Sequence, residues 1–282
     1  KGVLYTNAPG IARAFAKKQP VRGRNIHKSV TPAELNFRGR RAILIYIALD
    51  GAAHPSQEVS LLKTKKLLFI LNPRAGRNKP HGPLFDALAI LSGAGYLIRI
   101  HETSAPGDAA DTAAREGAGY DLVVAAGGDG TLNEVISGLM RLDAPPPLGY
   151  LPQGTTNDFA SSLQIPRTPA SAAKNIVQNR MRELDIGRWN ERSFIYVASF
   201  GAFTRSSYAA SQAAKNALGH FAYILEGMKD LNTLRPYHIR LTADGEVLDG
   251  DYLFGAVCNS TSIGGLMKLN PERVVLDDGK FE

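Results

Sequence analysis

Cysteine is almost absent from this sequence, because Cys258 is the only one among 282 residues. An internal disulfide is therefore excluded, and we expect the chain in a reducing compartment such as the cytoplasm. The sequence also lacks an apolar run long enough to cross a bilayer, since the longest candidate, residues 42–49, has only the length of a strand. The six histidines show none of the paired spacings of a zinc site. These absences leave a globular protein, long enough for two domains of ordinary size.

Acidic residues are scarce in the first 41 residues, which contain ten Lys or Arg and a single acidic residue, Glu34. The formal charge of +7 therefore belongs to this segment, and the rest of the chain is slightly acidic. Such a segment can bind anionic lipid headgroups or nucleic acid, or act as a transit-like leader. A solvated disordered tail is the simpler alternative, and we favour it. We expect residues 1–64 to form a basic, weakly structured N-terminal extension, and the chain, which begins with Lys1, to be a fragment.

The most informative stretch is residues 121–135, DLVVAAGGDGTLNEV. Residues 122–126 have the length and apolar composition of a buried strand, Gly127 to Gly130 form a glycine-rich turn, and Thr131 is expected to cap a helix that begins there. This order places backbone N–H groups and the positive end of a helix where a phosphate can bind. A tight turn without a ligand is the alternative. Asp129 favours a ligand, because a carboxylate among phosphate-binding amides is unfavourable unless a metal or a hydroxyl group uses it.

Two further loops are expected beside this turn. Residues 72–79 follow a predicted strand at 67–71, and residues 153–159 follow another at 148–152. The carboxyl ends of neighbouring strands meet at one edge, where open α/β sheets bind ligands. A plain chain turn at Asn72-Pro73 and a helix cap at Asn157 are structural alternatives. The side chains that these two loops offer to a phosphate are those of Asn72, Arg74, Arg77, Lys79, Thr155 and Asn157.

The pattern of strands and helices divides the chain into three parts. From residue 65, strands and helices alternate, which indicates a mostly parallel sheet covered by helices. After Pro166, we expect antiparallel strands, a largely helical stretch over residues 203–234 and a hairpin turn at Asp244-Gly245. The fold class is therefore α/β, with a mostly parallel-sheet domain over residues 65–165 and a β-rich domain over residues 166–282.

From about Lys65 onward, the chain resembles the diacylglycerol kinase catalytic family, in the branch of soluble bacterial lipid kinases that also includes sphingosine-kinase-like enzymes. The glycine turn alone also fits NAD kinases and phosphofructokinases, but the Leu-Asn-Glu continuation and the Asn-Asp-Phe block favour lipid kinases. The resemblance implies that the α/β domain over residues 65–165 is a nucleotide-binding domain for ATP, that the domain over residues 166–282 is a β-sandwich truncated at its C-terminal end, and that an acceptor lipid enters the cleft between them. Five blocks in the family's order carry it: residues 72–76 (NPRAG), 127–134 (GGDGTLNE), 154–159 (GTTNDF), 184–187 (LDIG) and 276–279 (LDDG).

The resemblance also implies the roles of individual residues. Asp129 would hold or orient the catalytic Mg²⁺ and the phosphates, and Asp158 would lie toward the lipid headgroup. A structural magnesium site would use the carboxylate of Asp278 and the carbonyls of Val275 and Lys280, with Asp185 nearby through water; an ordinary turn is the alternative there. The residues implied for ATP are Asn72, Pro73, Arg74, Ala75, Gly76, Thr103, Gly128, Asp129, Gly130, Thr131, Leu132, Asn133, Glu134 and Thr155.

One element of the family pattern is not matched. The family's general base lies in an Asp-Gly-Glu-type block on a later strand, which we expect beyond residue 282. Residues 244–246 are similar to that block but belong to an earlier hairpin, so we do not assign them the role.

The sequence thus predicts a cytoplasmic, peripherally membrane-associated lipid kinase that transfers the γ-phosphate of ATP to a hydroxyl of a lipid such as diacylglycerol. No specific nucleic-acid partner is expected, and a homodimer is compatible with the resemblance. An NAD kinase-like phosphotransferase and a non-catalytic nucleotide-binding regulator are the alternatives. The acceptor groove has four apolar candidates, which serve a core equally well: Phe203, Tyr208, Phe221 and Tyr223.

Overall fold

The computed structural model describes residues 42–46, 64–75, 82–189, 192–201, 236–243, 246–263, 267–270, 272 and 274–282. The basic segment over residues 1–41 and the expected helix over residues 203–234 lie outside these residues. The same holds for the four apolar candidates for the acceptor groove and for Gly76, Arg77 and Lys79.

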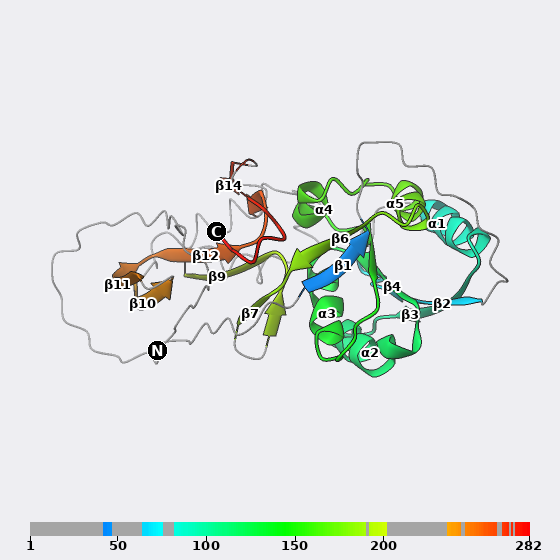
Figure 1. Ribbon diagram of the computed structural model, residues 1–282, viewed down its shortest axis with the longest axis horizontal. Helices are drawn as coiled ribbons and strands as arrows, with labels where there is room; N and C mark the ends of the chain where they lie inside the picture. Colours follow the sequence, from blue (N-terminus) through cyan, green and yellow to red (C-terminus); the bar gives the residue numbers. More distant parts are fainter. Residues whose placement is uncertain are drawn as a thin grey trace.

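A six-stranded sheet forms the centre of the α/β part, as Figure 1 shows. Its strand order is β3-β2-β4-β5-β1-β6. All neighbouring strands are parallel except β6, which is antiparallel to β1. The strands are β1 (Ala42–Tyr46), β2 (Lys65–Leu71), β3 (Tyr96–Glu102), β4 (Leu122–Gly127), β5 (Leu148–Pro152) and β6 (Met181–Asp185).

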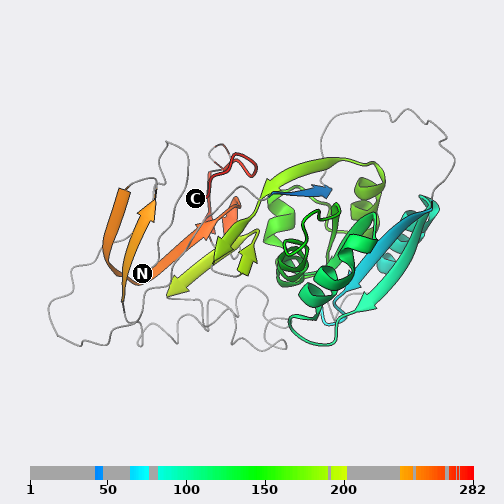
Figure 2. The same cartoon turned by 60° about the horizontal axis from the view of Figure 1, so that its bottom comes forward.

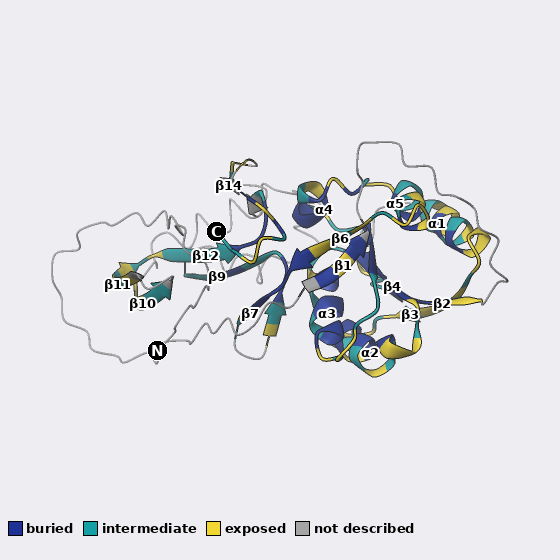
Figure 3. Ribbon diagram, in the orientation of Figure 1, coloured by how far each residue is buried: buried dark blue, intermediate teal, exposed yellow. Residues whose placement is uncertain are grey.

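Helices cover both faces of this sheet, as expected for a parallel sheet. Helices α1 and α5 pack against each other on one face, and α2 and α3 pack against each other on the opposite face (Figure 1). Strand β4 is therefore buried along its whole length, which Figure 3 shows in dark blue. The helical elements are α1 (Gly82–Gly93), α2 (Asp108–Glu116), η1 (Gly117–Gly119), α3 (Asp129–Leu139), α4 (Asp158–Ser162) and α5 (Pro169–Val177).

The contact between α2 and α3 depends on Gly138. A Cβ atom at this position would lie 2.1 Å from the carbonyl oxygen of Ala110 and 2.8 Å from the Cβ of Ala113. Both neighbours belong to α2, and backbone atoms inside a packed helix cannot yield easily. A glycine within a helix normally costs stability, but at this position in the last turn of α3 it is required by the close approach of the two helices.

Replacement of Gly138 with alanine should destabilise the fold. We expect Gly138→Ala to lower the free energy of unfolding by about 1–3 kcal/mol, because the new methyl group forces α2 and α3 apart. Urea denaturation measures this loss. The matched control is Gly119→Ala, since a Cβ at Gly119 meets no atom within 4 Å; equal stability losses in the two variants would refute the close approach.

The C-terminal part of the described chain is built from antiparallel strand pairs, so the expected β-rich character is confirmed. In Figure 2 this part and the α/β part form the two ends of an elongated molecule. Strands β10 and β11 are antiparallel and pair Ala243 with Glu246, on either side of the expected hairpin turn, whose own residues 244–245 lie outside those described. The four pairs are β7 (Gly187–Trp189) with β8 (Arg192–Phe194), β9 (Val197–Gly201) with β12 (Phe254–Cys258), β10 (Tyr237–Ala243) with β11 (Glu246–Tyr252), and β13 (Ser262–Ile263) with β14 (Met267–Lys268).

The domain limits predicted at residues 64 and 165 stay predictions, but two strands outside them belong to the central sheet. Strand β1 lies between β5 and β6, and its side chains Ile43 and Ile45 are buried in the core. Strand β6 pairs with β1 over five residues. The sheet thus includes residues on both sides of the predicted nucleotide-binding domain.

Candidate active site

A cleft of about 430 Å³ lies at the carboxyl edge of the central sheet. Its walls come from the loops that follow β2, β3, β4 and β5, which is the arrangement expected of a ligand site in an open α/β sheet. The lining residues are Asn72, Arg74, Ala75, Thr103, Ser104, Ala105, Pro106, Ala109, Gly128, Asp129, Gly130, Thr131, Glu134, Gly154, Thr155, Thr156 and Asn157. The three loops singled out in the sequence therefore meet in one cavity, joined by a fourth.

The glycine turn leads directly into α3. The helix begins at Asp129, with Gly128 in an extended conformation as its N-cap, so the expectation that Thr131 caps the helix is wrong. Instead the Oγ1 atom of Thr131 accepts a hydrogen bond from Nδ2 of Asn72 at 2.9 Å. The first N–H groups of an α-helix lack partners within the helix, and here they belong to residues that line the cleft. This helix end is suited to an anion.

Asn72 fixes the loop after β2 rather than offering a free side chain. The side-chain Oδ1 of Asn72 accepts from the backbone N–H of Arg74 at 2.9 Å, and the backbone N–H of Asn72 donates to the carbonyl of Ala126 at 2.9 Å. With the bond to Thr131, these contacts hold the loop against both β4 and α3. Arg74 is exposed beside the cleft and keeps its guanidinium available for a phosphate.

The turns after β4 and β5 touch through two glycines. A Cβ atom at Gly154 would lie 2.6 Å from the Cα of Gly128 and 2.7 Å from Oδ1 of Asn157. Asn157 has a left-handed backbone with φ of 51°, and its side chain bonds both the N–H of Gly154 at 2.8 Å and its carbonyl at 2.9 Å. The asparagine thus closes the turn. It also occupies the N-cap position of α4, the structural alternative considered for it, but its side chain makes no capping hydrogen bond.

Asp129 joins the glycine turn to the start of α4. Its Oδ2 accepts from the N–H of Asp158 at 3.0 Å, and its Oδ1 accepts from the N–H of Phe159 at 3.3 Å. Burial raises the pKa of Asp129 to about 6, an effect that these two N–H groups oppose and the nearby charge of Asp158 reinforces. The carboxylate therefore serves as the anchor of α4, and it also lines the cleft.

The raised pKa of Asp129 has a consequence for stability. Because the folded protein holds this proton more tightly than the unfolded chain does, the contribution of Asp129 to stability is fully present below the ordinary pKa of 3.8 and is lost as the pH rises through 6. The loss should reach at most about 3 kcal/mol. Urea unfolding of the unmodified protein and of Asp129→Asn at pH 4 and pH 7 measures it. A difference between the two proteins that does not change with pH would contradict the raised pKa.

Asp158 is buried, and its carboxylate faces the β-rich part. Its Oδ2 accepts from the phenolic hydroxyl of Tyr196 at 2.8 Å, and the carbonyl of Tyr196 accepts from the N–H of Asn259 at 3.1 Å. The structure thus links Asp158 to the residue before β9 and the residue after β12 instead of placing it among the lining residues. The expected position of Asp158 near a lipid headgroup stays a prediction.

The comparisons with known proteins agree with these features. The model of the diacylglycerol kinase catalytic domain matches residues 66–189. A diacylglycerol kinase of Bacillus subtilis strain 168 is 41% identical over 221 residues, which cover 77% of this chain and 72% of that protein. The chain belongs to the diacylglycerol kinase catalytic family. The resemblance is confirmed, and so is the expected class, a lipid kinase.

Other members of the diacylglycerol kinase family give the same result. A diacylglycerol kinase of Staphylococcus saprophyticus is 38% identical over 218 residues, covering 77% of this chain and 71% of that protein. A crystal structure of a diacylglycerol kinase from Bacillus anthracis strain Sterne superposes with a TM-score of 0.59 at 29% identity, covering 72% of this chain and 67% of that one. Both the sequence and the fold thus place the chain in this family.

Most of the residues that the family pattern implies for ATP meet in the cleft. Leu132 does not, because it is fully buried in the core, and Asn133 instead accepts from the N–H of Ile195 at 3.3 Å. Pro73 is also absent from the lining, and Gly76 lies outside the described residues. The predicted residues that line the cleft are Asn72, Arg74, Ala75, Thr103, Gly128, Asp129, Gly130, Thr131, Glu134 and Thr155.

The loop with the family's expected magnesium site closes on β6. The N–H of Gly279 donates to Oδ2 of Asp185, and Oδ1 of Asp278 accepts from the N–H of Lys280 at 3.0 Å. Val275, the third expected ligand, is exposed. Among the residues that the structure describes, no group of three or more His, Cys, Asp or Glu could hold a metal ion. The expected site relies instead on two carbonyls and a carboxylate, so it stays a prediction.

The sequence reasoning missed the wall formed by Ser104, Ala105, Pro106 and Ala109. Its signal was present, because residues 103–107 follow the strand over residues 96–101 at the same edge as the other loops. Tyr150 and Tyr196 were also missed. Tyr150 lies under the cleft, where its hydroxyl donates to Oδ1 of Asn157 at 3.4 Å and where burial raises its pKa well above the usual value. No local sequence signal predicts either contact.

Proposed function

We propose that this protein is an ATP-dependent kinase that transfers the γ-phosphate of ATP to the hydroxyl of diacylglycerol. The observation that carries the proposal is the cleft in which the glycine turn and the first turn of α3 meet Arg74 and Thr155, in a member of this family. Backbone N–H groups at a helix start and a guanidinium are the groups that bind phosphates. The relatives named diacylglycerol kinase support the acceptor.

The chain's own residues would act mainly by positioning and charge stabilisation. In this transfer the acceptor oxygen forms a bond to the γ-phosphorus and gives up its proton to a base, while the bond from that phosphorus to the β,γ-bridging oxygen breaks and ADP leaves. Such a reaction needs alignment and charge neutralisation more than covalent help. The N–H groups of Gly128 to Thr131 would hold the phosphates. Asp129 would hold the start of α4 against the glycine turn through its two hydrogen bonds.

Magnesium would be held by the oxygen ligands of the family pattern, which are the carboxylate of Asp278 and the carbonyls of Val275 and Lys280. The carboxylate of Asp278 lies on the loop that Gly279 ties to Asp185. Nδ2 of Asn259 donates to the carbonyls of Asp185 and Leu276, each at 3.1 Å, while its buried Oδ1 has no hydrogen-bond partner among the described residues. This hard oxygen set suits Mg²⁺. When bound, the ion would stabilise the loop that carries Asp278.

Membrane access is part of the same proposal. In the part of the chain that the structure describes, no helix has the length and apolar character to cross a membrane. The lipid acceptor would therefore be reached from the membrane surface, with help from the ten basic residues of segment 1–41. Deletion of residues 1–41 should lower the fraction of protein that sediments with vesicles containing anionic lipid. An unchanged fraction would contradict the proposed role of this segment in membrane binding.

A parallel assay of acceptors tests the function. Labelled ATP is incubated with the complete protein and either diacylglycerol in vesicles or NAD⁺ in solution. Label in phosphatidic acid supports the proposal. Label in NADP⁺ supports the NAD kinase-like alternative, and ATP binding without transfer to any lipid of a panel supports a regulator.

A further inference from the structure

The loop between β3 and α2 forms one wall of the cleft. Thr103, Ser104, Ala105 and Pro106 all line it, and Ala109 adds the first turn of α2. Backbone hydrogen bonds hold the two ends of this wall, from the N–H of Thr103 to the carbonyl of Leu71 at 2.8 Å and from the N–H of Asp108 to the carbonyl of Ala105 at 3.2 Å. The N-cap of α2 is Gly107, which has no side chain, so the side chain that holds Ser104, between these ends, comes from another residue.

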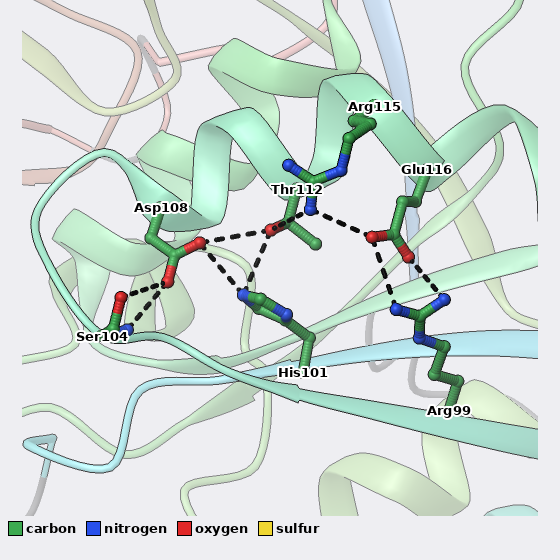
Figure 4. A network of polar contacts seen from close by, with 7 residues as sticks. All are labelled: Arg99, His101, Ser104, Asp108, Thr112, Arg115 and Glu116. Carbon is green, nitrogen blue, oxygen red and sulfur yellow. Dashed lines mark hydrogen bonds and ion pairs between the residues drawn. The ribbon is translucent and has the colours of Figure 1, made fainter.

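The carboxylate of Asp108 supplies this support. Its Oδ2 accepts two hydrogen bonds from Ser104, one from the backbone N–H at 2.8 Å and one from the hydroxyl at 2.9 Å (Figure 4). The bond from the N–H of Ser104 is the main reason why the pKa of Asp108 is lowered to about 2, and the carboxylate is therefore ionised throughout the working range of pH. A charged acceptor makes both bonds stronger than neutral ones.

Asp108 is itself held from the side opposite the loop. Its Oδ1 lies 3.0 Å from Nε2 of His101, on β3, and accepts from Oγ1 of Thr112 at 3.3 Å. Thr112 is fully buried on α2, so this support is rigid. Figure 4 shows the contacts continuing through Arg115 and Glu116 to Arg99, in the middle of β3. The carboxylate is thus fixed by both elements that the loop connects.

We propose that Asp108 is a positioning residue for nucleotide binding, which acts by holding the Ser104 backbone so that residues 103–106 keep the shape of the cleft wall. Asp108 is not among the lining residues, so it acts through Ser104 and not through contact with the ligand. The inference rests on the proposed function only in naming ATP as the ligand. The support of the loop itself is a property of the protein without ligand.

Two measurements on Asp108→Ala test the inference. Hydrogen exchange of the ligand-free protein should become about tenfold faster at the amide of Ser104 and unchanged in α3, because the acceptor of that amide is lost. The dissociation constant for ATP should rise about tenfold, equivalent to ~1.4 kcal/mol. The KM for diacylglycerol and the thermal midpoint should change little. Asp108→Asn keeps one oxygen acceptor and should restore part of both losses.

Asp111→Ala is the matched control, since Asp111 lies in the same first turn of α2, carries the same charge and is exposed, with Arg141 as its partner. If Asp108 acted only by repelling the phosphates, Asp108→Asn would lower the dissociation constant for ATP, whereas the inference expects this constant to rise. Unchanged exchange at Ser104, or tighter ATP binding, overturns the inference. A protein that exchanges as expected but binds no ATP in its unmodified form refutes the proposed function instead.

Discussion

Asp129→Ala should reduce the transfer of phosphate from ATP to diacylglycerol by about 10²- to 10³-fold. The side chain lines the cleft and accepts the N–H groups of Asp158 and Phe159, so its loss removes a charge beside the phosphates and releases α4 at the same time. Initial rates at saturating ATP and lipid measure the effect.

The fold should survive this change, because the rest of the first turn of α3 and the buried strand β4 do not depend on the carboxylate. Circular dichroism checks this point. Asp86→Ala is the control, since Asp86 is an exposed aspartate on α1, away from the lining residues. A folded Asp129→Ala protein that retains most of its activity would refute the role of this residue.

Gly154→Val should abolish measurable ATP binding while leaving a folded protein. Its Cβ would lie 2.6 Å from the Cα of Gly128, so the branched side chain must push the turn after β5 away from the turn after β4. Both turns line the cleft, and the N–H groups of the glycine turn then lose their common orientation. We expect a dissociation constant for ATP that is at least about 100-fold higher, as misplacement by about 1 Å is enough for such a loss.

Titration with a fluorescent ATP analogue measures this change. Gly93→Ala is the control, because a Cβ there meets no atom within 4 Å. ATP binding by Gly154→Val at the affinity of the unmodified protein would show that the contact between the two turns does not shape the nucleotide site.

The elements around the cleft could be predicted because their patterns are local. The strand over residues 122–126 is a short apolar run that ends at two glycines, and β4 spans residues 122–127. The hairpin at residues 244–245 was predicted from its turn residues alone. The start of α3 was misplaced by two residues, because Thr131 is a good cap in general but bonds Asn72 here, across 59 residues of sequence.

The parts that sequence reasoning could not supply are contacts between distant residues. Tyr196 reaches Asp158 from 38 residues away, and Asp129 reaches the start of α4 from 29 residues away. Strand β1 joins the sheet beside β5, although its surroundings in the sequence indicate an irregular extension. Such contacts are set by the packing of whole elements, which no local pattern of residue types describes.

A crystal structure of the protein soaked with a non-hydrolysable ATP analogue and Mg²⁺ tests the central claim most directly. The account predicts that the triphosphate lies against the backbone N–H groups of Gly128 to Thr131, with the carboxylate of Asp129 in the same pocket. A nucleotide bound elsewhere, with this pocket empty, would contradict it.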